Sequence, residues 1–191
     1  MNPAIRIRKQ KIKLRHEIRA GLSSISRRRL RDQSGVIASR LLKLRAYHEA
    51  TNIMVYWPLK DEPNLISLIR KSLADGKKVY LPRMKSGSRV LMEAYRIEKV
   101  PGELVAGPFG TLQPRGWRSR RISPSALSLI IVPGVSFDSE GGRLGRGLGC
   151  YDRFLKKADR AVFIGVGFKE QKIPCVPRNS KDIRMHYVVT A

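Results

Sequence analysis

The sequence predicts a doubly wound α/β fold, in which helices cover both faces of a parallel sheet. The candidate strands are continuous hydrophobic runs, which is typical of strands buried on both faces. Segments with helical periodicity lie between several of these runs, as in βαβ units. The length of 191 residues matches one compact domain, so a single domain over 1–191 is expected.

Helical periodicity predicts three helices. In residues 4–22, apolar side chains recur at spacings of three, four or seven and continue to position 25: Ile7, Leu14, Ile18, Leu22 and Ile25. A second helix follows to about Leu44, and a serine of the segment 23–26 supplies its N-cap. The third helix is expected over 63–75, where a glycine then ends it.

Short runs of apolar, β-branched and aromatic residues are the predicted strands. They span 52–58, 78–82, 90–97, 128–132, 161–168 and 187–190. The run 90–97 alternates loosely, as expected for a more exposed strand, and residues 99–121 are predicted to form a long loop rich in Pro, Gly and Arg. Ligands in such sheets lie at the carboxyl ends of the strands, so the residues after each strand are the first candidates for a site.

Positive charge is the most unusual property of the composition. Lys and Arg number 39 against 15 Asp and Glu, a net charge of +24, and half of it, +12, lies in residues 1–45. Such a surface attracts polyanions, although a solvated helix face explains the charge equally well. Two cysteines exclude a disulfide-rich scaffold and a Cys-based zinc site. No membrane span or secretory signal is expected, so the prediction is a soluble intracellular protein.

A glycine-rich segment follows the predicted strand 128–132. Five glycines fall within the nine residues 141–149, with Arg143 and Arg146 between them, and a helix is expected to begin near Gly149. A strand, a glycine-rich loop and a helix N-terminus form a cradle for anions, and arginines add bidentate contacts to phosphate. The spacing matches neither a Walker loop nor a dinucleotide fingerprint. The alternative is a flexible surface connection.

Four charged residues have both a functional and a structural interpretation. Asp152 lies at the cradle, where it suits Mg²⁺ held together with phosphate oxygens, or simply opposes the helix dipole. Lys11 and Arg15 are four residues apart and project from one helix face, either toward a ligand or into solvent. Glu62 follows the first strand and suits a ligand ring rich in N–H groups, or is a polar loop residue.

Other candidates are weaker. Tyr56 and Trp57 alternate across the first strand, so one faces the core and the other is free to stack on an aromatic ligand. Asp182 is either a second metal ligand or an N-cap. Cys150 has no His neighbour in sequence and is expected to be a packing residue. The histidines make no metal-binding spacing.

These motifs together resemble the 5-formyltetrahydrofolate cyclo-ligase family, also called methenyltetrahydrofolate synthetases. The resemblance rests on VPGVSFDSEGGRLGRGLGCYDRFL, IGVGFKEQ and DIRMHYVVT, and on the earlier pieces KIKLR at 11–15, YWPLKDE at 56–62 and YLPR at 80–83. It covers nearly the whole chain. It implies a three-layer α/β/α sandwich with a mostly parallel central sheet, which agrees with the fold predicted from the hydrophobic runs.

The resemblance implies an enzyme that converts 5-formyltetrahydrofolate to 5,10-methenyltetrahydrofolate, with ATP as co-substrate and Mg²⁺ as cofactor. In the family mechanism the formyl oxygen attacks the γ-phosphate with release of ADP, N10 then attacks the phosphorylated imidate, and phosphate leaves. The residues offer cations and a phosphate cradle but no obvious covalent nucleophile. Catalysis is therefore expected to come from positioning and charge stabilisation.

The resemblance also implies roles for individual residues. The ATP-binding positions are Lys11, Arg15, Arg143, Leu144, Gly145, Arg146, Gly147, Gly149 and Tyr151. The folate-binding positions are Trp57, Glu62, Arg146, Gly147, Leu148, Gly149 and Cys150. The magnesium positions are Asp152 and Asp182, and the catalytic groups are Arg146 and Tyr151.

Three positions depart from the family pattern. Cys150 replaces the first of two tyrosines, His186 stands where Asp is common, and Gln113 stands where Glu is frequent. Two alternatives therefore stay open: a basic RNA-binding protein on a degenerate scaffold of this kind, and an ATP-dependent ligase for another substrate. The leading interpretation predicts a cytoplasmic enzyme with small-molecule partners, without an obligate nucleic-acid or membrane partner, and a monomer or weak homodimer.

Overall fold

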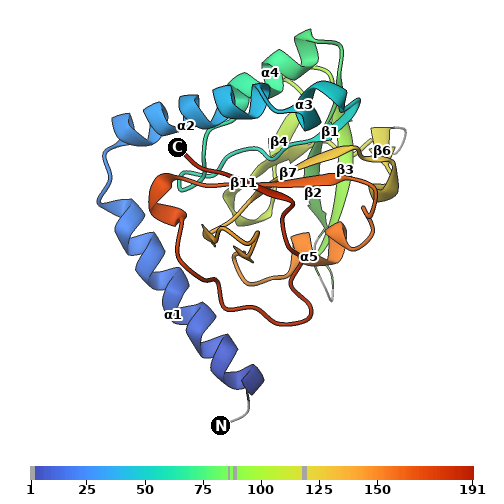
Figure 1. The fold of residues 1–191 in the computed structure, drawn as a ribbon. Coiled ribbons are helices and arrows are strands. Elements are labelled where there is room, and N and C mark those ends of the chain that lie inside the picture. Colours follow the sequence, from blue (N-terminus) through green and yellow to red (C-terminus); the bar gives the residue numbers. More distant parts are fainter. Residues whose placement is uncertain (1–2, 86, 88–89, 118–119) are drawn as a thin grey trace.

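A seven-stranded sheet forms the centre of the protein, as the computed structural model shows for residues 3–85, 87, 90–117 and 120–191 (Figure 1). Along the sheet the strands are β11 (Tyr187–Val189), β10 (Val162–Val166), β7 (Leu129–Pro133), β1 (Asn52–Met54), β2 (Lys78–Lys85), β3 (Leu91–Ile97) and β6 (Arg121–Ile122). The pairs from β11 to β2 are parallel, whereas β3 and β6 pair antiparallel. The predicted mostly parallel sheet is confirmed.

Helices cover both faces of the sheet and complete three layers. On one face lie α2 (Arg27–Leu42), α3 (Arg45–Glu49) and α4 (Ile66–Ala74), and on the other lies α5 (Cys150–Leu155) (Figure 1). Short 3₁₀ turns occur at Pro108–Gly110, Pro124–Ala126 and Lys169–Gln171.

The strand side chains alternate between two hydrophobic layers. In β1, Ile53 packs in the layer under α2 to α4, whereas Met54 packs in the layer under α5. In β7, Ile131 and Ile130 divide in the same way. Because both faces of these strands are buried, their sequences are continuous apolar runs, as the prediction assumed.

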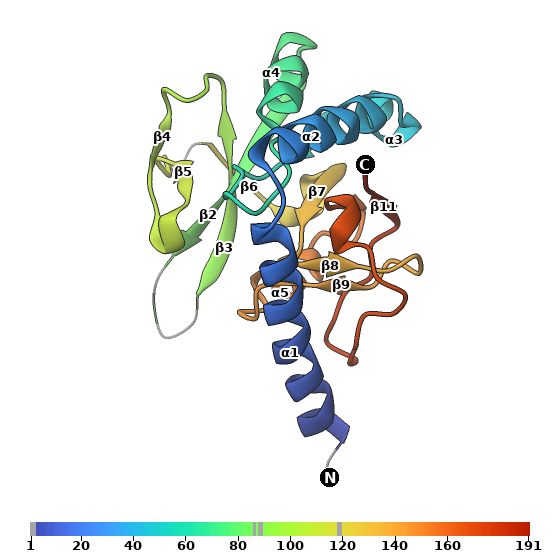
Figure 2. The same ribbon diagram turned by 90° about the vertical axis from the view of Figure 1, so that its left-hand side faces the viewer.

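The first helix, α1 (Pro3–Ser23), matches its predicted range closely and extends away from the body, with the N-terminal end farthest out (Figures 1 and 2). Near its C-terminal half, Leu14 and Ile18 pack on a small cluster that includes Val135 and Leu144. This contact places α1 beside the glycine-rich segment. No helix in the described ranges is long and apolar enough to cross a membrane.

Some boundaries differ from the predictions because the connecting segments make hydrogen bonds of their own. The first strand ends at Met54, and beyond it Val55 alone continues the ladder by donating its N–H to the neighbouring strand. The third predicted helix begins only at Ile66, whose N–H donates to the Asn64 side chain at 3.1 Å. Strand β2 runs beyond 82 to Lys85 because β3 pairs with it over that length.

Two hairpins lie where the sequence predicts loops. The segment 99–121 contains β4 (Leu104–Ala106) and β5 (Leu112–Pro114), and the glycine-rich segment contains β8 (Ser136–Phe137) and β9 (Arg143–Leu144). Strands of two or three residues are too short to carry a periodic pattern, so the sequence did not reveal them. The β8–β9 turn needs Gly141, which has a φ of +80° and whose missing Cβ would lie 2.2 Å from a backbone carbonyl oxygen.

Candidate active site

A cleft of 1230 Å³ lies between α1, the carboxyl ends of β1 and β7, and the glycine-rich loop. It contains every residue to which the sequence assigned a role: Lys11, Arg15, Trp57, Glu62, Arg143, Leu144, Gly145, Arg146, Gly147, Leu148, Gly149, Cys150, Tyr151, Asp152 and Asp182. Segments from both ends of the chain thus meet at the strand ends, where ligands bind in open α/β sheets.

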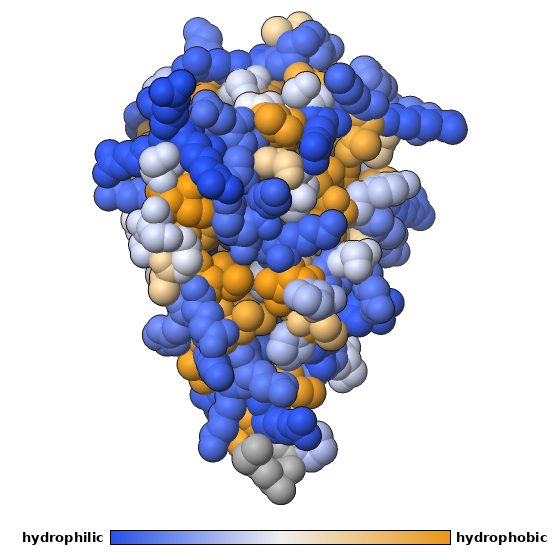
Figure 3. All heavy atoms as spheres, turned by 60° about the vertical axis from the view of Figure 1, so that its left-hand side comes forward, coloured by the Kyte–Doolittle hydropathy of each residue, from blue (hydrophilic) through white to orange (hydrophobic). Residues whose placement is uncertain are grey.

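The cleft combines a cationic lining with apolar walls. Nine Lys and Arg side chains and three carboxylates line it among the described residues. Three of the large apolar side chains that line it are also exposed: Ile12 (46%), Leu112 (38%) and Leu148 (49%). Figure 3 shows the corresponding pattern on one face, where hydrophilic side chains surround an apolar patch at the middle. The lining suits an anionic ligand that also has a ring system.

The phosphate-loop candidates lie between β9 and α5. Gly147 and Gly149 have φ angles of +111° and +62°, a region that L side chains rarely adopt. A Cβ on Gly145 would lie 3.0 Å from the Arg143 guanidinium, and one on Gly147 would lie 3.6 Å from that of Arg15. Glycines therefore allow this loop to turn while two arginines lie close to its backbone.

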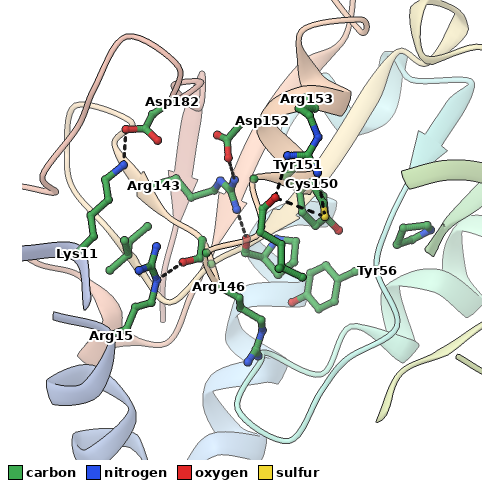
Figure 4. Close-up of a pocket in the computed structure, with 18 of the residues that line it drawn as sticks. Lys11, Arg15, Tyr56, Arg143, Arg146, Cys150, Tyr151, Asp152, Arg153 and Asp182 are labelled. Carbon is green, nitrogen blue, oxygen red and sulfur yellow. Dashed lines mark hydrogen bonds and ion pairs between the residues drawn. The ribbon is translucent and has the colours of Figure 1, made fainter. Parts of the chain in front are cut away.

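Lys11 and Arg15 project from the same face of α1 toward this loop, as their spacing predicts (Figure 4). The Arg15 Nε donates to the Gly145 carbonyl oxygen at 2.8 Å. The Lys11 ammonium contacts Asp182 at 2.5 Å. Burial lowers the pKa of Arg15, and the nearby Arg19 lowers it further. Both cations are therefore held at the cleft and are not part of a solvated helix face.

Arg143 is more deeply buried than a surface ligand would be. It is 6% exposed, and its guanidinium donates to the Pro133 carbonyl oxygen and to the Asp152 Oδ2, both at 3.1 Å (Figure 4). It also lies over the Tyr151 ring, 5.4 Å from the centroid. Its Nε is buried and has no hydrogen-bond partner among the described atoms. Arg143 thus connects the loop, the strand end and the carboxylate.

Arg146 crosses the cleft to the segment that follows β1. Its Nη2 lies 2.6 Å from Asp61 Oδ1 and 2.9 Å from Glu62 Oε1, and its Nε lies 3.2 Å from Glu62 Oε1. Burial raises the pKa of Glu62, although the Arg146 charge and the Leu59 N–H oppose that change. The sequence analysis missed Asp61, although it precedes Glu62 directly.

The two aromatic side chains after β1, Tyr56 and Trp57, both line the cleft but differ in exposure. Tyr56 is buried and donates its hydroxyl to the Pro63 carbonyl oxygen at 2.8 Å, whereas Trp57 is half-buried at the cleft.

Burial and the Glu62 charge raise the pKa of Tyr151 well above its ordinary value. The Tyr151 phenol therefore stays protonated at neutral pH and is able to donate a hydrogen bond.

Asp152 and Asp182 face the cleft but already have partners. Asp152 accepts from Arg143 and, at 3.2 Å, from the Ile183 N–H. Asp182 accepts from Lys11 and, at 2.7 Å, from the Asn179 N–H. No group of three or more His, Cys, Asp and Glu side chains within the described ranges is arranged to hold a metal. A metal ion bound by Asp152 and Asp182 would therefore need most of its ligands from a substrate or from water.

The three positions that depart from the family pattern are accommodated by packing. Cys150 is buried, which raises its pKa, and its sulfur lies 3.6 Å from Arg153. Gln113 is buried at the cleft and accepts the Met84 N–H at 2.9 Å. The His186 Nδ1 accepts the Phe163 N–H at 2.8 Å, so this ring is hydrogen-bonded to strand β10.

Several cleft residues were not singled out from the sequence. Arg8 and Arg19 continue the cationic face of Lys11 and Arg15 at spacings of three and four, a periodicity that extends the one already noted. Other cleft residues come from loops and strand ends that no local pattern connects to it: Met84, Thr111, Leu112, Lys156, Asn179 and Lys181.

The fold and this cleft define an α/β protein with a cationic cleft at the carboxyl edge of its sheet. The chain belongs to the 5-formyltetrahydrofolate cyclo-ligase family, which it matches over residues 7–191. It is 31% identical over 196 residues to a probable 5-formyltetrahydrofolate cyclo-ligase of Schizosaccharomyces pombe, covering 95% of each chain. It is 26% identical to the 5-formyltetrahydrofolate cyclo-ligase of Mus musculus, covering 97% of this chain and 96% of that one.

A solved structure agrees with this assignment. The 5,10-methenyltetrahydrofolate synthetase of Aquifex aeolicus superposes with a TM-score of 0.81 at 32% identity, covering 94% of this chain and 89% of that one. The resemblance inferred from the motifs is therefore confirmed.

Proposed function

We propose that this protein catalyses the ATP- and Mg²⁺-dependent cyclisation of 5-formyltetrahydrofolate to 5,10-methenyltetrahydrofolate, with release of ADP and phosphate. One observation carries the proposal. In a member of the cyclo-ligase family, one cleft gathers all the residues to which the motifs assigned ATP, folate or metal binding.

ATP phosphates are proposed to lie against the loop Gly145–Gly149, between α1 and α5. From α1, Arg15 contacts this loop at Gly145, and Lys11 lies beside it in contact with Asp182. Arg143 precedes the loop, and its buried Nε donor has no partner among the described atoms. Charged donors of this kind bind phosphate oxygens strongly. The surrounding cations also favour an anionic ligand by their combined field.

Folate is proposed to occupy the opposite side of the cleft. Trp57 offers an aromatic face there, and Glu62 offers a buried carboxylate for the N–H groups of the pterin. Leu148 and Ile12 add exposed apolar surface that suits the aromatic part of the substrate. Cys150 lies at the end of the loop, where it contributes packing.

Mg²⁺ fits this donor set as an ion held partly by the substrate. Mg²⁺ binds through one or two carboxylates, with phosphate oxygens and waters as the remaining ligands. Asp152 and Asp182 would hold it, which agrees with the lack of a larger acidic cluster in the described ranges. When bound, the ion would neutralise charge on the phosphates. Lys11 and Arg143, the present partners of these carboxylates, would then be free to contact phosphate oxygens.

The proposed chemistry requires positioning more than a covalent enzyme intermediate. The formyl oxygen attacks the γ-phosphate and ADP leaves; N10 then attacks the carbon of the phosphorylated imidate, the ring closes, and phosphate leaves. Arg146 is proposed to stabilise the charge on the transferred group. Tyr151, protonated at neutral pH, is proposed to donate a hydrogen bond to a reacting oxygen.

The remaining parts of the proposal concern its setting. We propose that residues 1–191 act as a single unit in the cytoplasm, as a monomer or weak homodimer. Small molecules are its proposed partners, and neither nucleic acid nor membrane is required.

The decisive experiment incubates the protein with 5-formyltetrahydrofolate, ATP and Mg²⁺ and records the methenyl chromophore. The expected result is product only when ATP and Mg²⁺ are both present. Product formed equally well in excess chelator would remove the metal from the reaction. Absence of product under all conditions, together with tight and saturable RNA binding at near-physiological salt, would favour the RNA-binding alternative. In that case the logarithm of the RNA-binding constant would fall linearly with the logarithm of the salt concentration, with a slope set by the number of phosphates neutralised.

A further inference from the structure

Arg146 is proposed to contact both substrates, and its side chain lies at the folate side of the cleft, beside Glu62. It belongs to the phosphate loop, yet its side chain extends away from Arg143 and Asp152 (Figure 4). Its guanidinium is instead held by Asp61 and Glu62, at 2.6 and 2.9 Å. Two carboxylates therefore hold this cation at the folate side of the cleft.

The same contact occupies Glu62. Its Oε1 accepts from Arg146, and its Oε2 accepts the Leu59 N–H at 3.1 Å. The Glu62 side chain is 7% exposed, so it has little room for further donors. A pterin N–H group that binds Glu62 would compete with Arg146 for the same carboxylate.

Asp61 differs from Glu62 in its surroundings. Its side chain is 35% exposed, and it does not line the cleft. Within the described ranges its contact with Arg146 is its one ion pair. Asp61 thus holds Arg146 against Glu62 from outside the ligand space.

We propose that Asp61 is a positioning residue that holds Arg146 in this place and thereby couples the two substrate sites. Folate bound at Glu62 takes the place of Arg146, and Arg146 then turns to the phosphates of ATP. This inference rests on the proposed function. Linkage requires the effect to be reciprocal, so each substrate tightens the binding of the other.

The expected magnitude follows from the exposure of the contact. A half-exposed ion pair is worth at most about a fivefold change in an equilibrium constant. Asp61→Asn keeps the side chain nearly the same size and removes its charge. Without folate, Asp61→Asn should therefore bind ATP about two- to fivefold more tightly than the wild type. Folate should then tighten ATP binding by a correspondingly smaller factor.

The test is calorimetric titration with Mg²⁺ and a non-hydrolysable ATP analogue, with and without 5-formyltetrahydrofolate. Wild type is compared with Asp61→Asn and Asp61→Glu. Asp159→Asn, at an exposed position, is the matched control for loss of one negative charge. The expected result is tighter analogue binding and weaker coupling in Asp61→Asn, restoration by Asp61→Glu, and no change beyond experimental error in Asp159→Asn.

Other outcomes separate this inference from the proposed function. Equal effects of Asp61→Asn and Asp159→Asn would overturn the inference, because general electrostatics would then explain both. Unchanged analogue binding and coupling in Asp61→Asn would overturn it as well, even in an active enzyme. A wild type that binds no folate would refute the proposed function, whereas tighter analogue binding by Asp61→Asn would still support the hold on Arg146.

Discussion

Replacing Arg143 with alanine should destabilise the protein far more than replacing Arg15, although both side chains line the same cleft. Arg143 is 6% exposed and donates to the Pro133 carbonyl oxygen and to Asp152. Loss of these bonds leaves a buried acceptor and a partly buried carboxylate without their partner, which costs about 3 kcal/mol. For a chain of this length, Tm should fall by about 6–12 °C.

Among the described residues, Arg15 makes one side-chain hydrogen bond, through Nε to the Gly145 carbonyl oxygen at 2.8 Å, and it is only half-buried. Its replacement should cost about 1 kcal/mol and lower Tm by about 2–4 °C. Calorimetric unfolding of both variants measures these values, with Arg6→Ala on the exposed part of α1 as a control of the same residue type. Equal Tm values for Arg143→Ala and Arg6→Ala would refute the conclusion that Arg143 is a structural part of the cleft wall.

Three further predictions concern pH, backbone and salt. Burial raises the pKa of Glu93, but hydrogen bonds from Lys85, Tyr95 and Arg121 outweigh it and lower the pKa to about 2. The Glu93 carboxylate therefore stabilises the fold at pH values above its ordinary pKa, and this stabilisation is lost as the pH falls toward 2. The difference in Tm between the wild type and Glu93→Gln should shrink over that pH range. Gly141→Ala should lower Tm more than Gly147→Ala, because its Cβ meets a backbone oxygen at 2.2 Å whereas the other meets a movable Arg15 side chain at 3.6 Å. The kcat/KM should fall as salt shortens the Debye length from about 30 Å to about 8 Å, most steeply for polyglutamylated folate, and a flat salt series would exclude steering by the cleft cations.

Local patterns predicted much of the fold because they report burial. The runs at 128–132 and 161–168 are almost entirely apolar, and both contain strands that are buried on two faces, β7 and β10. The stripe over 4–22 predicted α1 nearly to the residue. The hairpin β8–β9 was missed because each of its strands has two residues, and hydrogen bonds to Asp138 hold its turn in place of any repeating pattern.

The sequence by itself determined the fold class, the glycine-rich segment and, through its motifs, the candidate residues that the structure gathers in one cleft. Only the tertiary structure decided which of them touch. Lys11 meets Asp182 across 171 residues of sequence, and Arg146 meets Glu62 across 84. Periodicity describes neighbours along one element, whereas these contacts depend on where the strand order and the path of α1 bring separate segments together. For the same reason, the sequence did not reveal the contact of Asp61 with Arg146 or the burial of Arg143.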